Sequence, residues 1–551
     1  MGKRWDIEDD FRALSADGEE RASLLLERLR RRRALEEESG LPFSEVGSAP
    51  SAMHQAVERT LRAVSNREKI ALFGDFDCDG ITAVCQLQRA LRRRGAEPVV
   101  RLPQRVIDGY GIRIKHVEEF AGAGVSLLFL LDTGIVAHAE IAAAVRAGMD
   151  VIVLDHHRLP SELPPAFAII HPELASRPGA SLAAAGVVFG FVSALEGWKD
   201  WPGKEEDIAL AAIGTVADLV PLKGSNRTLV RVGIEALQTL DSGPLSALCK
   251  TAGIARRMTS RDIAFRIAPR LNAAGRMADP VIALRALQGD GDALILLENF
   301  NTLRQDSVRT ILSKVRVTAG EKAFLCLASK EYPAGVVGLV AGKLTETYGR
   351  PSLVAHMHGD ICTASLRSVF GYDVTEALRS CSDLLLTFGG HSGAAGCTFR
   401  ASVFEDLATR LDAHARSLLS SEDLVPTLAI DGVLDPDHIS LSLCNTIGAL
   451  EPFGEGNREP RFLIPSVQLS ALRRVGREFM HLQGAIGKHK MVGFQFGALF
   501  ERIPATVDVA CRLSIDSWNN REQPQIILED VRVPEAVSVG GREEEEISRV
   551  A

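Results

Sequence analysis

The sequence predicts an α/β protein with four structured parts: a large domain on a parallel sheet, a helical linker, a smaller α/β domain and a strand-rich end. Three observations lead to this prediction. The 551 residues exceed what one hydrophobic core usually supports. Between residues 70 and 155, short apolar runs alternate with helical segments, the rhythm of a parallel sheet covered by helices. From about Asp423, spaced strand-like runs suit a small barrel or sandwich.

The predicted elements follow one another along the chain. Residues 1–50 are expected to form a helical lead-in followed by a loop with Gly, Pro and Ser. The predicted strands of the first sheet include the apolar runs IALF, VSLLFLL and VIVL. A helix through DIALAAIGTVADLVPL brings in Asp218, and helices continue to about residue 318. A second alternating segment starts near Lys322, and the acidic end GGREEEEISRVA is expected to be disordered.

Composition and charge narrow the class of protein. Hydrophobic content of 46% with 24% charged residues is typical of a soluble globular chain. The most apolar stretch is interrupted by Asp132, so no membrane span is predicted, and the N-terminus lacks the apolar core of a secretion signal. The nine cysteines contain no CxxC pair, which excludes a zinc ribbon and favours reduced thiols in a cytoplasm. A net charge of −8 does not indicate nucleic-acid binding, yet it counts carboxylates that a bound metal would neutralise.

Acidic side chains follow the predicted strands of the first sheet. DFDCDG follows IALF, DTG follows VSLLFLL, and DHH follows VIVL. Because ligands of parallel sheets bind at the carboxyl ends of the strands, we expect these side chains to converge at one sheet edge. The expected cluster contains Asp75, Asp77, Asp79, Asp132, Asp155, His156, His157 and Asp218. A single aspartate at a strand end is more often a cap or turn former, but four acid-bearing segments are improbable as independent caps.

One alternative reading of DFDCDG is the opening of an EF-hand calcium loop, which has the pattern D-x-D-x-D-G. A calcium loop starting at Asp75 needs a bidentate glutamate at its twelfth position, and that residue is Gln86. The run before it also indicates a strand, whereas an EF-hand loop lies between two helices. The calcium interpretation is therefore strongly disfavoured.

Clustered carboxylates imply bound cations. Unneutralised, they would repel one another and their pKa values would rise, and divalent ions remove this problem. Oxygen ligands with one or two imidazoles favour Mn²⁺ or Mg²⁺ over a structural zinc. Two ions about 3.5 to 4 Å apart, bridged by one aspartate, form a clamp for in-line attack of water on phosphorus. We therefore predict two divalent cations as cofactors.

The motifs also carry a family resemblance. DFDCDG, LDTG, LDHH and GTVADLVPL resemble the four successive motifs of the DHH phosphoesterase superfamily. PQRVIDGYG, LNAAGRM, GGHSGAAG and LEPFGEGNREP are similar to motifs of its RecJ family, bacterial single-strand-specific 5′→3′ exonucleases. The implied domains are a helical N-terminal segment (1–50), a DHH catalytic domain (51–235), a helical linker (236–320), a DHH-associated domain of DHHA1 type (321–420), an OB-like nucleic-acid-binding domain (421–537) and a disordered tail (538–551).

The resemblance implies a role for each acidic motif. The metal ligands would be Asp77, Asp79, Asp132, His156 and Asp218, with Asp75 as a further ligand or a partner of one. Asp132 would bridge the two ions. Asp155 would orient a histidine, and His157 would contact the scissile phosphate and supply or relay a proton to the leaving oxygen. Asp132, Asp155 and His157 are thus the predicted catalytic residues.

Other motifs offer substrate contacts. Arg105 and Arg276 would grip a backbone phosphate, and Asn272 would fix the loop or a ligand. A guanidinium beside hydroxyl groups suits a phosphate, and a glycine run offers unblocked backbone N–H groups. These candidates are Ser365, Arg367 and Ser368, then Gly390 and His391. In the OB-like domain, the expected wall residues are Arg473, Arg474, Arg477 and Trp518.

The sequence departs from the family pattern at four positions. Phe73 stands where some members carry a histidine, so Asp75 would carry more of that ion's coordination or the ion would bind weakly. Thr133 stands where asparagine or cysteine is common, and Ala184 where glycine is usual. Neither removes a proposed ligand. Phe479 stands where relatives tend to place histidine, which affects the polar contacts of the last domain.

These features predict a metal-dependent exonuclease that degrades single-stranded DNA from the 5′ end by phosphodiester hydrolysis, in DNA repair and recombination. One alternative is another DHH phosphoesterase, acting on short oligonucleotides or phosphonucleotides, against which the OB-like segment argues. The other is a non-catalytic single-strand-binding replication scaffold, against which the full ligand set argues. Candidate partners besides DNA are a single-strand-binding protein and a helicase. The chain is expected to be a cytoplasmic monomer without membrane contact. The physiological metal, activity on RNA and processivity are not specified by the sequence.

Overall fold

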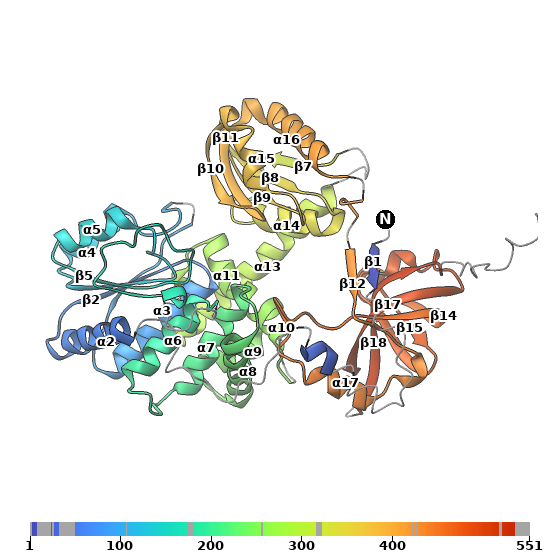
Figure 1. Ribbon diagram of the computed structural model, residues 1–551, viewed down its shortest axis with the longest axis horizontal. Helices are drawn as coiled ribbons and strands as arrows, with labels where there is room; N and C mark the ends of the chain where they lie inside the picture. The colour runs from blue at the N-terminus through green and yellow to red at the C-terminus, as the bar shows by residue number, and fades with distance from the viewer. Residues whose placement is uncertain are drawn as a thin grey trace, which may run out of the picture. The chain divides into compact units, whose positions relative to one another are not determined.

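The computed structural model of the chain describes residues 3–7, 24, 27–31, 33, 50–105, 107–174, 181–254, 257–315, 322–420, 422–425, 427–516 and 521–534. The tail at 538–551, Trp518 and most of residues 1–50 lie outside the described residues. The chain divides into two compact units (Figure 1). The larger consists of residues 30–424 with 451–458, and the smaller of residues 1–29, 425–450 and 459–551.

A five-stranded parallel sheet forms from the first alternating segment. Its strands are β2 (Ile70–Gly74), β3 (Val99–Arg101), β4 (Leu127–Leu131), β5 (Asp150–Leu154) and β6 (Ala168–Ile170), in the order β3–β2–β4–β5–β6. The register pairs Gly74 with Leu131, and Leu131 with Leu154, so the carboxyl ends of the three central strands are level. The residues that follow these ends therefore lie beside one another.

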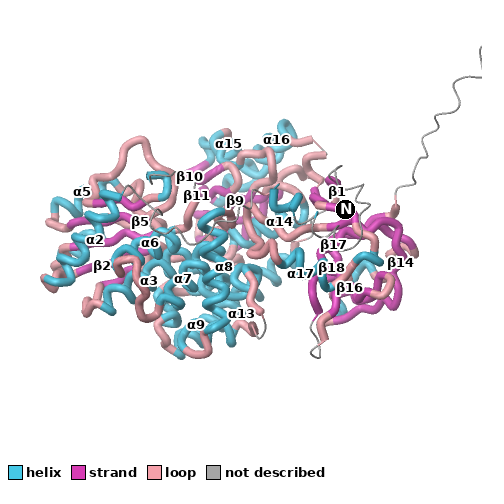
Figure 2. The backbone as a smooth tube through the Cα atoms, turned by 60° about the horizontal axis from the view of Figure 1, so that its bottom comes forward, coloured by secondary structure: helices cyan, strands magenta, loops and turns pink. Residues whose placement is uncertain are grey.

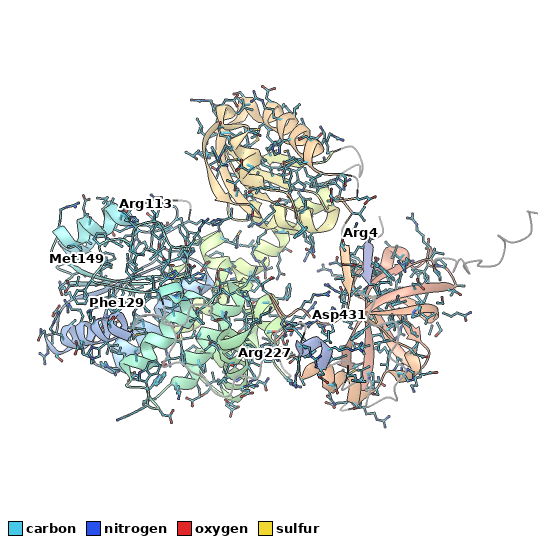
Figure 3. All side chains as sticks on the ribbon, in the orientation of Figure 1. Arg4, Arg113, Phe129, Met149, Arg227 and Asp431 are labelled. Atoms are coloured by element: carbon cyan, nitrogen blue, oxygen red, sulfur yellow. The ribbon has the colours of Figure 1, made fainter. Side chains whose placement is uncertain are left out.

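Helices cover both faces of this sheet (Figure 1). One face carries α2 (Pro50–Ser65), α3 (Cys78–Arg93), α6 (Ala184–Leu195) and α7 (Lys204–Ala217). The other carries α4 (Ile114–Gly122) and α5 (His138–Arg146). Phe129 of β4 packs in the first of these cores, within the sheet region seen in Figure 3, and Phe73 of β2 packs in the second. Burial on both faces explains why the strands are continuous apolar runs.

A helical region follows the sheet along the chain (Figure 2). Its elements are α8 (Gly224–Thr239), α9 (Gly243–Thr251), α10 (Ser260–Asp262), the π-helical turn η4 (Ile263–Ile267), α11 (Ala268–Met277), α12 (Val281–Leu287) and α13 (Gly291–Lys314). α8 packs on α7, and α11 packs on the long helix α13. The side chain of Asp290 accepts a hydrogen bond from the Ala293 amide (3.1 Å) and so caps the start of α13.

The second alternating segment forms a separate sheet in the larger unit. Its strands are β7 (Leu325–Ser329), β8 (Ser352–His358), β9 (Ile361–Arg367), β10 (Leu385–His391) and β11 (Ala394–Arg400), in the order β10–β11–β9–β8–β7. Only β7 and β8 pair in parallel. α14 (Val337–Tyr348) packs on one face, and α15 (Val374–Arg379) and α16 (Phe404–Leu418) pack on the other.

The smaller unit contains a closed barrel. Its strands are β13 (Gly432–Val433), β14 (Phe462–Val475), β15 (His481–Ile486), β16 (His489–Gly493), β17 (Thr506–Asp516) and β18 (Gln523–Arg532), with α17 (Leu441–Gly448) before β14. β14 pairs with both β15 and β17, which closes the sheet, and β16 runs parallel to β18. This is the strand pairing of an OB-fold.

The expectation of a helical N-terminal segment is wrong for residues 4–7. β1 (Arg4–Ile7) is a strand that pairs in parallel with β12 (Thr427–Ile430). Trp5 anchors it, because its indole Nε1 donates to Asp530 (2.8 Å) and its ring lies under the Arg532 guanidinium (4.3 Å). Elsewhere, the nine cysteines are free, and none of the described helices combines the length and apolarity needed to cross a membrane.

Candidate metal centre and nucleic-acid interface

Three adjacent strands deliver the first acids of the site. Asp75, Asp132 and Asp155 each follow the last residue of a central strand, and the paired strand ends are level. The Asp75 amide donates to the Leu131 carbonyl (3.2 Å), and the Asp132 amide donates to the Leu154 carbonyl (3.0 Å). The sheet therefore continues one residue beyond each strand, and it places the three carboxylates in a row.

The remaining acids of DFDCDG sit at the start of α3. The Asp77 carboxylate caps this helix by accepting from the amides of Asp79 (3.0 Å) and Gly80 (3.2 Å). Asp79 reaches across to α6 and accepts from the amides of Ala184 (2.7 Å) and Ala185 (2.9 Å). A Cβ at Gly80 would lie 2.7 Å from the Asp75 backbone, so the tight turn that gathers these acids requires glycine there.

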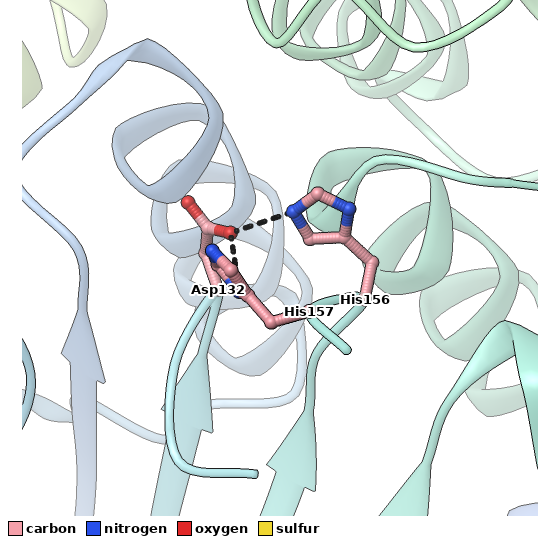
Figure 4. A group of neighbouring side chains, drawn as sticks. All are labelled: Asp132, His156 and His157. Carbon is pink, nitrogen blue, oxygen red and sulfur yellow. Dashed lines mark ion pairs between the residues drawn. The ribbon is translucent and has the colours of Figure 1, made fainter. Parts of the chain in front are cut away.

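Three sets of possible ligands each have donor atoms within 4.8 Å of one another: Asp75, Asp77 and Asp132; Asp79, His156 and Asp218; and Asp132, His156 and His157. Figure 4 shows the Asp132 carboxylate joined by dashed lines to both histidines. His156 Nε2 lies 3.3 Å from Asp132 Oδ1 and 3.7 Å from Asp218 Oδ2. Asp132 therefore links two adjacent sets, as expected of a bridging ligand.

Several of these ligand atoms have no hydrogen-bond partner. Within the described part of the chain, they include Asp75 Oδ1, Asp132 Oδ1 and His156 Nε2, all buried. Buried polar atoms are seldom left in this state, and carboxylate and imidazole donors gathered in such sets fit divalent cations. Asp75 is thus placed to act as a ligand. Phe73 is fully buried against the His116 ring (5.1 Å between centroids) and cannot contribute.

The electrostatics of the site also call for cations. Burial, and then the charge of Asp77, raise the pKa of Asp75 well above its usual value. Burial and the neighbouring carboxylates raise the pKa values of Asp79 and Asp132 in the same way. Burial and Asp77 raise the pKa of Asp218 to about 7. Without a cation, these carboxyl groups resist ionisation near neutral pH.

The backbone of Asp132 is strained. Its φ of 60° lies in the left-handed region, which costs a non-glycine residue about 1–2 kcal/mol. Leu219, directly after Asp218, has the same φ of 60° and an exposed side chain. Strain of this kind persists where the surrounding structure imposes it, and it is concentrated at active sites. Asp132 is itself a predicted metal ligand, and Leu219 directly follows another, Asp218.

The pKa values of His156 and His157 are shifted in opposite directions. Burial, and then the charge of His157, lower the pKa of His156 to about 4, so its imidazole is neutral and able to ligate. Burial would lower the pKa of His157 too, but the hydrogen bond to Asp155 and the charges of the nearby carboxylates together raise it to about 9. Asp155 Oδ1 accepts from His157 Nδ1 (2.7 Å), and Asp155 Oδ2 accepts from the Ile135 amide (3.0 Å). These contacts are those that the predicted orienting role of Asp155 requires.

Tyr110 is a member of this group that the sequence analysis missed. Its hydroxyl lies 2.8 Å from His157 Nε2, the ring nitrogen not occupied by Asp155. Its ring packs edge-on against Phe76 (6.3 Å between centroids). The motif PQRVIDGYG contains Tyr110 and could have indicated it, but only Arg105 of this motif was predicted as a site residue.

Arginines stand beside the acidic cluster. The Arg105 guanidinium lies over the Phe76 ring (5.3 Å), within the field of Asp75 and Asp77. Arg276, on α11, is close enough to Arg105 that burial and this like charge lower the pKa of Arg276 to about 10. A Cβ at Gly335 would lie 1.9 Å from the Arg276 carbonyl oxygen, so the second α/β segment approaches α11 at this point.

The sheet of the second α/β segment adds Ser365 and Arg367, both on β9. A Cβ at Gly338 of α14 would lie 3.3 Å from Ser365 Oγ and 3.6 Å from Arg367 Nη2, so the glycine leaves room beside these groups. Burial, and then the charge of Arg105, lower the pKa of Arg367. Arg105, Arg276 and Arg367 thus share one electrostatic neighbourhood next to the acids.

The other predicted substrate residues lie elsewhere or have structural contacts. Asn272 Oδ1 accepts from the Cys78 amide (2.9 Å) and so fixes the start of α3. Ser368 Oγ donates to the Tyr372 carbonyl (2.6 Å) within a turn. His391 is exposed at the end of the edge strand β10, separated from Arg367 of β9 by Ala394 of β11. Gly390 must be glycine because a Cβ there would meet the Ala394 carbonyl oxygen at 2.5 Å.

Arg304, in the middle of α13, is a second residue that the sequence analysis missed. Its Nη2 donates to Asn301 (2.8 Å), while its buried Nε has no partner among the described residues. Arg304 is also one of the charges that lower the pKa of Arg276. Where the structure is described, no ion pair joins a carboxylate to the arginine cluster, defined as Arg105, Arg276, Arg304 and Arg367. No motif marked Arg304, because it lies inside an ordinary helix.

Known domain families match the chain in this order: the DHH family N-terminal domain at residues 69–215, the DHHA1 domain at 320–417 and the RecJ OB domain at 430–530. The single-stranded-DNA-specific exonuclease RecJ of Thermus thermophilus is 34% identical over 496 residues, which cover 89% of this chain and 72% of the relative. The chain belongs to the RecJ family. The RecJ of Bacillus subtilis is also 34% identical, over 503 residues that cover 88% of this chain, and the chain spans 64% of that relative's length.

Solved RecJ structures share this fold. The crystal structure of Thermus thermophilus RecJ with Mn²⁺ matches with a TM-score of 0.82 at 29% identity, covering 97% of this chain and 80% of that one. The structure of the same protein with Mg²⁺ gives a TM-score of 0.76 at 28% identity, covering 97% and 79%. The predicted RecJ resemblance and the predicted fold class, with its OB-like barrel, are therefore confirmed.

Proposed function

We propose that this RecJ-family chain is a metal-dependent exonuclease that degrades single-stranded DNA from the 5′ end. The observation that carries the proposal is the meeting of two features at one sheet edge. Buried, partnerless ligand atoms of Asp75, Asp132 and His156 lie beside arginines that have no carboxylate partner among the described residues. Cations and a phosphate are the ligands that satisfy both. The relatives are named single-stranded-DNA-specific exonucleases.

The donor set fits Mn²⁺ or Mg²⁺, the ions in the crystal structures of Thermus thermophilus RecJ. Asp75, Asp77 and Asp132 would hold one ion, and Asp79, His156 and Asp218 would hold the other. When bound, the ions neutralise the carboxylates, polarise the phosphate and activate the attacking water. The neutral imidazole of His156 suits a ligand.

His157 serves the leaving group. Water adds to the phosphorus, the bond from phosphorus to the 3′ oxygen of the first nucleotide breaks, and that oxygen takes up a proton. Asp155 holds Nδ1 of His157, so Nε2 is the nitrogen that faces substrate and can deliver the proton. Tyr110 contacts the same nitrogen at 2.8 Å and must yield this position to the phosphate when DNA binds.

The arginine cluster would account for degradation of the strand from its 5′ end. A 5′-terminal phosphate carries more charge than an internal phosphodiester, and guanidinium groups bind it through paired hydrogen bonds. Arg105, Arg276 and Arg367, with the Ser365 hydroxyl, supply such a site next to the acids. Each cleavage leaves a new 5′ phosphate on the remaining strand, which can occupy the cluster again.

The alternatives, another DHH phosphoesterase or a non-catalytic scaffold, are disfavoured by the RecJ OB domain match and by the complete ligand set. A single-strand-binding protein and a helicase as partners, a monomeric state and a cytoplasmic location stay predictions.

The function can be tested with end-labelled DNA. Single-stranded and duplex DNA labelled at either end, short RNA and pyrophosphate are each incubated with the chain in Mn²⁺, Mg²⁺ or EDTA. We expect nucleotides to be released from the 5′ end of single-stranded DNA, with Mn²⁺ or Mg²⁺ only. Preference for duplex DNA, release from the 3′ end or full activity in EDTA would contradict the proposal.

A further inference from the structure

One motif of the sequence has no part in the proposed mechanism. LEPFGEGNREP lies between α17 and β14, and its residues 451–458 belong to the larger unit, although the chain on either side of them belongs to the smaller unit. We refer to residues 451–458 as the finger. The finger is thus a short piece of chain that leaves the smaller unit, packs on the larger one and returns.

Hydrogen bonds within the finger and to the larger unit hold it in place. The amides of Gly454 and Asn457 each donate to the other residue's carbonyl oxygen (2.9 and 3.1 Å), which closes a tight turn. Asn457 is fully buried, and its Oδ1 accepts from Arg33 Nη1 (3.0 Å). Ser260 Oγ, at the start of α10, donates to the Phe453 carbonyl (2.5 Å). The finger is therefore anchored on both sides of its tip.

The tip of the finger contacts the loop that follows Asp218. The Leu222 amide donates to the Glu455 carbonyl (2.8 Å). A Cβ at Gly454 would lie 2.6 Å from Leu222 Cδ1 and 3.1 Å from its Cγ, so the backbone of the tip rests on this side chain. Leu222 is 1% exposed and packs in the core beneath the first sheet, so it cannot turn away. The contact therefore requires glycine at position 454.

The same loop is strained beside the metal centre. Leu219 directly follows Asp218, and its φ of 60° costs about 1–2 kcal/mol. Such a conformation persists where the surrounding structure imposes it. Asn226 Nδ2 donates to the Pro221 carbonyl (3.0 Å), and the finger holds Leu222. These two contacts fix the end of the loop and oppose relaxation of its strained start.

We propose that the finger positions Asp218 for metal binding by holding the loop that follows it. The inference rests on the proposed function, in which Asp218 holds an ion with Asp79 and His156. Without the contact at Leu222, the strained backbone of Leu219 would relax, and the Asp218 carboxylate would shift relative to the other two ligands. Loss of a group that orients a ligand typically lowers metal affinity about 10- to 100-fold. Occupation of this site would then depend on a segment whose two ends continue into the smaller unit.

The test measures Mn²⁺ binding to the full chain by calorimetry, without DNA. Gly454→Ala adds the Cβ that meets Leu222, whereas a Cβ at Gly448, the last residue of α17, would meet nothing within 4 Å. We expect Gly454→Ala to weaken the binding of one Mn²⁺ about tenfold and to leave the other unchanged. Gly448→Ala, the matched control, should bind both ions as the unmodified chain does. Urea unfolding of each variant reports the stability of the fold.

The Asp218→Ala background shows whether the effect passes through Asp218. Two changes that act on the same group are not additive, whereas independent changes are. Gly454→Ala should therefore cause no further loss of Mn²⁺ affinity in this background. A merely structural role would lower the free energy of unfolding in both backgrounds and leave the Mn²⁺ affinities unchanged.

Three results would overturn the proposal: unchanged Mn²⁺ affinity in Gly454→Ala, an equal loss in Gly448→Ala, or a further loss in the Asp218→Ala background. If Gly454→Ala does not fold, Ser260→Ala is the milder variant, because it removes only one hydroxyl that anchors the finger, and the same results decide. Cleavage in Mn²⁺ is measured separately on the unmodified protein. Binding of two Mn²⁺ ions without cleavage would refute the proposed exonuclease while the role of the finger stands, whereas cleavage with unaffected finger variants would refute that role alone.

Discussion

Replacing Gly335 by alanine would place a methyl group where the second α/β segment meets α11. The Cβ of that alanine would lie 1.9 Å from the Arg276 carbonyl oxygen and 2.7 Å from its carbonyl carbon. Both are backbone atoms, so no side-chain rotation relieves the clash. Because Cβ atoms hardly ever approach such an atom within 3.0 Å, the two segments must separate by at least about 1.1 Å.

That separation changes the geometry of the arginine cluster. Arg276 moves with α11, while Ser365 and Arg367 move with β9, so a phosphate held by both sides loses contact with one of them. A misplacement of about 1 Å can reduce catalysis about 100-fold. The ligand sets of the metal centre contain no residue of the second α/β segment among those described, and they should be spared.

The assay compares Gly335→Ala with Gly342→Ala, whose Cβ would meet only the flexible Arg367 side chain, at 3.9 Å. We expect Gly335→Ala to lower kcat/KM on single-stranded DNA by about 100-fold, with Mn²⁺ binding by calorimetry unchanged and Gly342→Ala near the parent value. Equal activity of the two variants would refute the reasoning, and loss of Mn²⁺ binding in Gly335→Ala would show that the damage is not confined to the substrate side.

Three further outcomes are expected. Asp132→Ala should abolish cleavage and weaken Mn²⁺ binding in calorimetry, because it removes the shared ligand, while DNA binding in EDTA stays largely intact; retained turnover would contradict the metal assignment. Arg304→Ala should raise KM for single-stranded DNA about tenfold, whereas Arg309→Ala, on the same helix but paired with Asp306, should not; equal KM values would remove Arg304 from the cluster. Burial alone would raise the pKa of Asp108, but hydrogen bonds from Lys115 and the Gln104 amide hold this pKa at about 2. Because the pKa in the unfolded chain is 3.8, the ionised carboxylate stabilises the fold at pH values above 3.8. Asp108→Asn should therefore cost about 2 kcal/mol in urea unfolding at pH 6, and the difference should shrink as pH falls from about 4 to 2; a constant difference would exclude this linkage.

The parallel sheet and its acidic edge could be predicted because both depend on local sequence. Each of Asp75, Asp132 and Asp155 directly follows an apolar run that is buried on both sides, and level strand ends bring such residues together. The strand β1 could not be predicted in this way. It owes its conformation to β12, more than 400 residues later in the chain, and no local pattern encodes that partner.

The candidate site was predictable where motifs carried it. Arg304 lies inside a 24-residue helix and gains its place only when α13 packs on α11, so its own surroundings in the sequence are uninformative. The Tyr110 hydroxyl contacts His157, which lies 47 positions later in the chain, so the contact forms only in the folded domain. Ser368 was predicted to touch substrate because it lies next to Arg367, but its hydroxyl is engaged in a turn.

Asp79 joins the metal centre to the folding of the domain. Both of its carboxylate oxygens accept hydrogen bonds from backbone amides in the first turn of α6, and the start of this helix is buried. Removing the carboxylate would leave these two amide donors without an acceptor, which would cost about 1–3 kcal/mol of stability for each. An Asp79 variant would thus be a poor choice for capturing a DNA complex, because loss of activity and loss of native protein could not be told apart. Asp218 ends α7, but it caps that helix with its backbone amide, which donates to the Gly214 carbonyl (2.9 Å). Its carboxylate is only partly buried and accepts no helix amide in the described structure, so a substitution there offers the cleaner inactive form for capturing bound DNA.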